Sequence, residues 1–75
     1  MLYTSTRDDT VRVESAAAIT MGISAEGGLF VPETVPRLLP DEIARLVGYD
    51  YIGRAKAILP RFLTDFTKAE IDDCV

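Results

Sequence analysis

Two short stretches of this sequence carry residue types that could bind an anion. In the first, Ser5-Thr6-Arg7, two hydroxyls and a guanidinium could converge on a phosphate group. The second is Gly27-Gly28, since consecutive backbone N–H groups in glycine-rich loops can cradle phosphate. Each stretch therefore has a chemical interpretation, an anion site, and a structural one.

The residues that follow Gly27-Gly28 favour a structural turn. They form the run LFVP, residues 29–32, which is typical of a strand ended by proline. Phosphate loops instead lead into a helix, and they contain either a Gly-Lys-Ser/Thr ending or a third glycine. Gly27 and Gly28 are accordingly predicted to turn the chain, because glycine permits positive φ. For residues 5–7, an anion site and an ordinary hydroxyl-rich strand end followed by a surface arginine both stay open.

Residues for covalent or metal catalysis are sparse. The chain has no histidine, and its single cysteine, Cys74, cannot build a structural zinc site alone. A Schiff-base lysine needs a desolvated pocket. Lys56 lies at the margin of an amphipathic helical face and Lys68 in the first turn of a helix, so neither is expected to be buried. No catalytic, cofactor-binding or metal-binding residue is predicted on this chain.

The bulk composition narrows the class of protein. Hydrophobic residues make up 48% of the 75 residues and charged ones 27%, which is ordinary for one globular domain. The net charge of −4 argues against nucleic-acid binding, which requires a basic surface. No apolar run approaches the roughly 20 residues that span a bilayer, so no membrane partner is expected. A lone cysteine indicates a reducing, cytoplasmic location.

The N-terminal half is predicted to contain both strands and a helix. Ser15 is the expected N-cap of the helix, and Gly22 suits the left-handed residue after its end. Because Ala16, Ile19 and small neighbours share one face, we expect this helix to be largely buried. The predicted elements are a strand over residues 2–6, an extended piece over 11–13, a helix over 15–21 and a strand over 29–31.

Residues 32–40 contain three of the four prolines of the chain and are predicted to form an extended crossing segment. The rest of the C-terminal half is predicted to be helical. Pro60 should break or kink the second of the helices, and Thr67 with Glu70 forms a capping box for the last. The predicted helices cover residues 41–48, 51–59 and 67–75. The fold class is therefore α+β: a small helix-rich domain with two to three short strands and three to four helices. The last helix has no C-cap, so we expect a longer parent chain; the alternative is a frayed terminal helix.

Three segments resemble the N-terminal domain of threonine synthase. Tyr3-Thr4-Ser5-Thr6-Arg7 is similar to the Tyr-x-Ser-Thr-Arg-like opening of that family, and residues 16–22 match its alanine-bearing helix that ends in glycine. Residues 26–32, EGGLFVP, resemble the family's Asp-Gly-Gly-Leu-Phe-Val-Pro, with Glu26 in place of aspartate. The resemblance extends more weakly over the whole of residues 1–75.

The resemblance implies a parent enzyme, a carbon–oxygen lyase of threonine biosynthesis. Threonine synthases use pyridoxal phosphate to convert O-phosphohomoserine and water into threonine and phosphate, and their cofactor-binding motifs lie downstream of the matched region. Residues 1–75 would then be a non-catalytic domain, truncated before the catalytic pyridoxal-phosphate domains, that packs on them through residues 29–31 and its apolar helix faces. A homodimer of the fragment is a further possibility. The alternative function is a stand-alone acidic protein-interaction module.

Overall fold

Three strands and four helices form the computed structural model, which describes all of residues 1–75. In chain order they are β1 (Leu2–Ser5), β2 (Val13–Glu14), α1 (Ser15–Met21), β3 (Phe30–Pro32), α2 (Pro40–Val47), α3 (Tyr51–Phe62) and α4 (Lys68–Cys74). The predicted α+β class and the predicted numbers of strands and helices are confirmed. The strand boundaries differ from the predicted ones by one or two residues.

Strand β1, which is rich in hydroxyl and aromatic residues, lies at the centre of a small antiparallel sheet with the order β2-β1-β3. On one side Tyr3 pairs with Val13, and on the other it pairs with Pro32. Proline has no N–H to give to a ladder, and β3 is an edge strand, so Pro32 costs the sheet no inner hydrogen bond.

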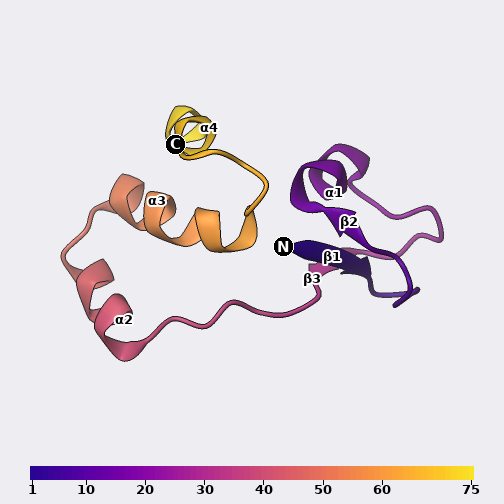
Figure 1. The fold of residues 1–75 in the computed structure, drawn as a ribbon, viewed down its shortest axis with the longest axis horizontal. Coiled ribbons are helices and arrows are strands. Elements are labelled where there is room, and N and C mark those ends of the chain that lie inside the picture. Colours follow the sequence, from indigo (N-terminus) through magenta and orange to yellow (C-terminus); the bar gives the residue numbers. More distant parts are fainter.

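The chain is spread out for its size. The sheet and α1 lie at one end of the molecule and the three other helices at the opposite end, with an extended segment running between β3 and α2 (Figure 1). The radius of gyration is 14.0 Å, against about 11 Å for a compact chain of this length. The accessible surface of 5274 Å² exceeds the about 4,500 Å² of a folded monomer of this mass. Only 6 of 75 residues are buried.

Helices α2, α3 and α4 begin where local signals predict. Pro40 occupies the first turn of α2, and the Asp50 carboxylate accepts the backbone N–H of Gly53 at 2.8 Å at the start of α3. At α4 the capping box is complete: the Glu70 N–H donates to Thr67 Oγ1 at 3.1 Å, and the Thr67 N–H donates to Glu70 Oε1 at 2.8 Å. These bonds satisfy N–H groups that a helix start otherwise leaves unpaired.

The prediction that Ser15 caps α1 is wrong. Glu14 is the N-cap residue and its side chain makes no capping bond, while Ser15 is the first helical residue. The cap comes instead from Asp65, in the connection between α3 and α4, whose carboxylate accepts the Ala16 N–H at 3.0 Å and the Ser15 hydroxyl. An ionised acceptor forms stronger bonds than a neutral one. The Ser15 hydroxyl therefore donates to Asp65 rather than accepting from its own helix.

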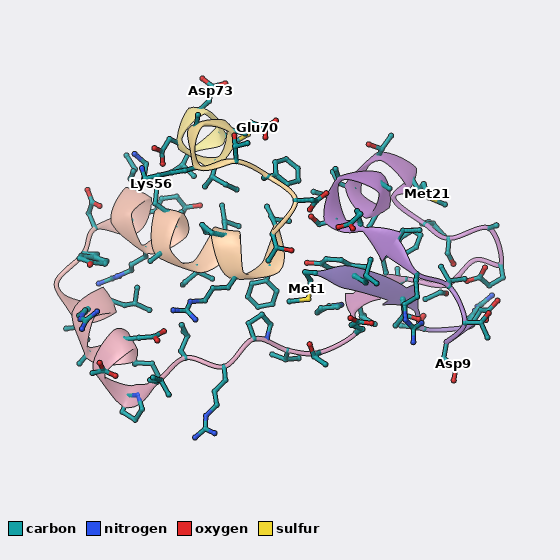
Figure 2. The ribbon with its side chains drawn as sticks, viewed as in Figure 1. Met1, Asp9, Met21, Lys56, Glu70 and Asp73 are labelled. Atoms are coloured by element: carbon teal, nitrogen blue, oxygen red, sulfur yellow. The ribbon has the colours of Figure 1, made fainter.

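The predicted end of α3 at residue 59 is also wrong, because the helix continues through Pro60 to Phe62; Pro60 therefore does not break the helix. Proline removes one intrahelical bond by lacking an N–H. The Leu63 N–H then bonds to the Leu59 carbonyl at 2.9 Å, so the helical pattern resumes after the proline. The predicted burial of α1 is wrong as well. Only Ser15 and Ala18 are buried, and Met21, which lies on the side of α1 that faces away from the other helices (Figure 2), is 50% exposed.

The Asp65 cap should contribute measurably to stability. We expect Asp65→Ala to lower the free energy of unfolding by about 1–2 kcal/mol, because it leaves the first N–H groups of α1 without their acceptor. Urea unfolding followed by circular dichroism measures the change. Asp73→Ala is the matched control, since Asp73 projects from α4 away from the rest of the chain (Figure 2). Equal unfolding midpoints for the two variants would contradict the cap.

Candidate functional site

The end of β1 and the glycine turn meet in a cluster of hydroxyl groups. Ser5 and Ser24 are both buried, and their Oγ atoms lie 2.9 Å apart. Ser5 Oγ also accepts the Arg7 N–H at 3.1 Å, and Ser24 Oγ accepts the Gly28 N–H at 3.1 Å. Both buried hydroxyls therefore have their hydrogen bonds met within the protein, as buried polar groups require.

Gly27 and Gly28 are each required for a different geometric reason. Gly27 has φ of +85°, a backbone conformation that residues with a side chain rarely adopt. Its N–H bonds to the Ser24 carbonyl at 2.9 Å. At Gly28 the constraint is space, since a Cβ would lie 2.1 Å from Ser5 Oγ and 3.0 Å from the Arg7 nitrogen. The turn thus lets one backbone approach the end of β1 more closely than any side chain allows.

The structure brings the two stretches considered for anion binding together, as partners of each other. The Leu29 N–H donates to Thr6 Oγ1 at 2.9 Å, and the Thr6 N–H donates to the Leu29 carbonyl at the same distance. Arg7 Nη1 donates to the Glu26 carbonyl at 3.3 Å. The hydroxyls and the turn N–H groups that an anion would need are engaged in bonds within the chain. Both interpretations of residues 5–7, an anion site and a hydroxyl-rich strand end followed by a surface arginine, stay open.

Glu26 adds a negative charge to this cluster. The pKa of its carboxyl lies below the ordinary value, chiefly because the Ser24 hydroxyl donates to the carboxylate, with a smaller contribution from the nearby Ser5 hydroxyl. Hydrogen bonds of this kind favour the ionised form. A carboxylate held ionised beside Arg7 opposes the approach of a phosphate, since like charges repel.

Ser24 and Asp65 are two residues that sequence reasoning missed. Ser24 had a local signal, because a serine before a Glu-Gly-Gly turn is well placed to bond to the backbone of that turn. Asp65 had none: its partners, Ser15 and Ala16, lie about 50 residues away along the chain. Only the folded structure brings that carboxylate to the start of α1.

A hollow of about 230 Å³ lies beside α1. Tyr3 borders it, and the Tyr3 hydroxyl donates to the Phe62 carbonyl at 2.8 Å. Burial raises the pKa of the Tyr3 phenol, and the negative charge of Asp65 raises it further. The hollow is smaller than the roughly 300–1,000 Å³ of small-molecule sites. It is lined by Tyr3, Ser15, Ala18, Ile19, Gly22, Phe30 and Leu63.

The lysines do not fit a pyridoxal phosphate site. Lys56 and Lys68 border a groove between α3 and α4, and their Nζ atoms lie 3.8 Å and 2.8 Å from the carboxylate of Asp72. The hydrogen bond from Lys68 is the main reason that the pKa of Asp72 is lowered. The side chains of Lys56, labelled in Figure 2, and Lys68 are 43% and 88% exposed. A Schiff-base lysine requires dry surroundings, which neither has.

No three histidine, cysteine or acidic side chains gather where they could hold a metal ion. None of the four helices combines the length and the apolar composition that crossing a bilayer requires.

The chain is similar to the beginning of threonine synthases. A sequence profile of the family described as the threonine synthase N terminus matches residues 2–75. Threonine synthase from Pseudomonas aeruginosa is 35% identical over 84% of this chain, and threonine synthase-like 1 from Mus musculus is 38% identical over 77%. The matched regions are 13% and 8% of those two proteins, so this chain spans a small part of the length of its relatives.

The three-dimensional fold of the chain is also similar to that of a threonine synthase. The crystal structure of threonine synthase from Escherichia coli matches 97% of this chain with a TM-score of 0.88 and 26% sequence identity, and the match covers 17% of that enzyme. Because the sequence profile and the fold agree over nearly every residue, the chain belongs to the threonine synthase N-terminal family.

Proposed function

We propose that this chain serves as the N-terminal domain of a threonine synthase and packs against the catalytic body of that enzyme. The observation that carries the proposal is the match of 97% of the chain to only 17% of the E. coli enzyme. A segment of that size, with few buried residues of its own, gains stability by covering a larger neighbour. The partner would be the catalytic domains of the same polypeptide, and the location would be the cytoplasm.

The proposal assigns all bond-making chemistry to the remainder of the enzyme. That remainder would hold pyridoxal phosphate and convert O-phosphohomoserine and water into threonine and phosphate. The lysines of this chain support such a division, because both are ion-paired with Asp72 and partly exposed to solvent. The hydroxyl cluster supports it too, since its donors are already engaged by backbone and side-chain acceptors.

Within this domain we propose that Gly27 and Gly28 have a structural role, and that residues 5–7 do too. The close approach of Gly28 to Ser5 joins the turn to the sheet and sets the position of β3. This role needs no ligand. It competes with the anion site on residues 5–7 that the sequence leaves open.

Domain exchange tests the proposed function. Replacing the matched segment of E. coli threonine synthase with residues 1–75 should yield an enzyme that releases threonine from O-phosphohomoserine, while the same enzyme without that segment should not. The isolated 75-residue chain should release none, and with added pyridoxal phosphate it should develop no imine absorption band. A chimera no better than the deleted enzyme would favour the stand-alone interaction module.

Substitution of Gly28 tests the structural role of the turn. Gly28→Ala should lower the free energy of unfolding by about 1–3 kcal/mol, the usual cost of overpacking, because its Cβ would clash with Ser5 Oγ. Gly48→Ala is the control, since its Cβ would meet only a carbonyl oxygen at 3.7 Å. Adding Ser5→Ala should restore part of the loss. Additive losses in the double variant, measured by urea unfolding, would contradict the clash.

Phosphate titration separates the turn from an anion site. Because the hydroxyls of Ser5 and Thr6 are engaged within the chain, amide signals of residues 5–7 should not move in NMR spectra at millimolar phosphate. Shifts confined to those residues and abolished by Arg7→Ala would establish an anion site instead.

A further inference from the structure

Helix α1 and the residues after it as far as Ala25 carry no charge, and the first charged residue of the loop is Glu26, which lies between Ile23 and Leu29 in the sequence. Residues 15–25 contain no acidic or basic side chain. Three large apolar residues in or next to this run are open to solvent: Ile19 is 62% exposed, Ile23 60% and Leu29 62%. Ile23 and Leu29 pair across the loop in an isolated antiparallel bridge, which places their side chains on one side of it. We call Ile19, Ile23 and Leu29 the α1 patch.

A second set of exposed apolar residues, on α2, has a different character. Ile43 is 51% exposed, but it lies between Asp41 and Arg45, an exposed ion pair with 3.6 Å between its charged atoms. Charged side chains are depleted at the centres of protein interfaces and common at their rims. By this criterion the α1 patch is suited to the centre of an interface, and the α2 surface is suited to solvent or a rim.

We infer that the α1 patch is the surface through which this domain docks on the remainder of a threonine synthase chain. An apolar side chain of that remainder would fill the 230 Å³ hollow that Ile19 and Phe30 help to line. The inference rests on the proposed function and adds to it the face that is covered and the chemistry of its partner: an apolar, charge-poor surface of the catalytic body.

The surface area of the chain supports the remainder of the same polypeptide as the partner that covers the α1 patch. The accessible surface of 5274 Å² is about 750 Å² above that of a compact monomer of the same mass. A stable interface buries about 800 Å² on each partner, so the excess is close to what one docking face requires. In the E. coli relative the matched segment is 17% of the chain, and the rest of the same polypeptide is tethered beside it. Tethering raises the effective concentration of that partner above any separate one.

The chimera with the E. coli enzyme provides the test, with Ile23→Glu as the probe and Ile43→Glu as its control. The two substitutions are chemically identical and both sites are exposed in the free chain. Burying an unpaired carboxylate is costly, so Ile23→Glu should speed proteolytic release of residues 1–75 from the chimera by about tenfold or more. Ile43→Glu should leave the release rate within about twofold, since a charge at a solvent-exposed position costs little.

Each other outcome has a definite meaning. If the unsubstituted chimera makes no threonine, the proposed function fails and this inference fails with it. If that chimera is active but Ile43→Glu has the larger effect, or both variants behave alike, the inference alone fails. Light scattering on the 75-residue chain tests whether a second copy of the chain binds the α1 patch instead. A dimer that Ile23→Glu dissociates would assign the patch to that second copy. The circular dichroism spectra of both variants as isolated chains should match that of the unsubstituted 75-residue chain. Such a match excludes misfolding as the cause of faster proteolytic release.

Discussion

The contact between the Asp65 carboxylate and the first turn of α1 holds the two ends of this molecule together. It joins the connection after α3 to the sheet end through the Ser15 hydroxyl and the Ala16 N–H. The Tyr3 hydroxyl adds a second link to the Phe62 carbonyl. Both links are polar bonds to backbone or hydroxyl groups near helix ends. The relative placement of the sheet and the helices therefore depends on hydrogen-bond geometry more than on a shared apolar core.

This constraint explains why serine is prominent among the buried residues. Ser5, Ser15 and Ser24 are buried, while the buried apolar side chains are only Ala18 and Ile71. A buried hydroxyl contributes stability only when its bonds are satisfied. Here each of the three hydroxyls has a hydrogen-bond partner. The arrangement of the interior therefore depends on the directions of these hydrogen bonds as well as on how side chains fill space. A chain organised in this way leaves many of its large apolar residues exposed, as Ile19, Ile23 and Leu29 are.

Local chemistry explains which parts of the fold could be predicted from the sequence. The capping box of α4, the proline at the start of α2 and the positive φ of Gly22 follow from residues within four positions of one another. The cap on α1 and the exposure of that helix depend on contacts across about 50 residues. Such contacts leave no local pattern in the sequence from which they could be predicted. The length of α3 could not be predicted for a related reason: a proline weighs against a helix, but the bonds on either side of it decide whether the helix ends.

The two segments that carry the family resemblance are explained by their contact with each other. Residues 3–7 and 26–32 form the β1–β3 pairing, and at its end Ser5 meets Gly28 at a distance that excludes a Cβ. A glycine is required there because Ser5 occupies the space, and Ser5 is satisfied because Ser24 and the Arg7 N–H surround it. Motifs that look like a phosphate loop can therefore arise from packing between backbones alone. The distinction lies in whether the N–H groups already have acceptors, as the N–H groups of Gly27, Gly28 and Leu29 do.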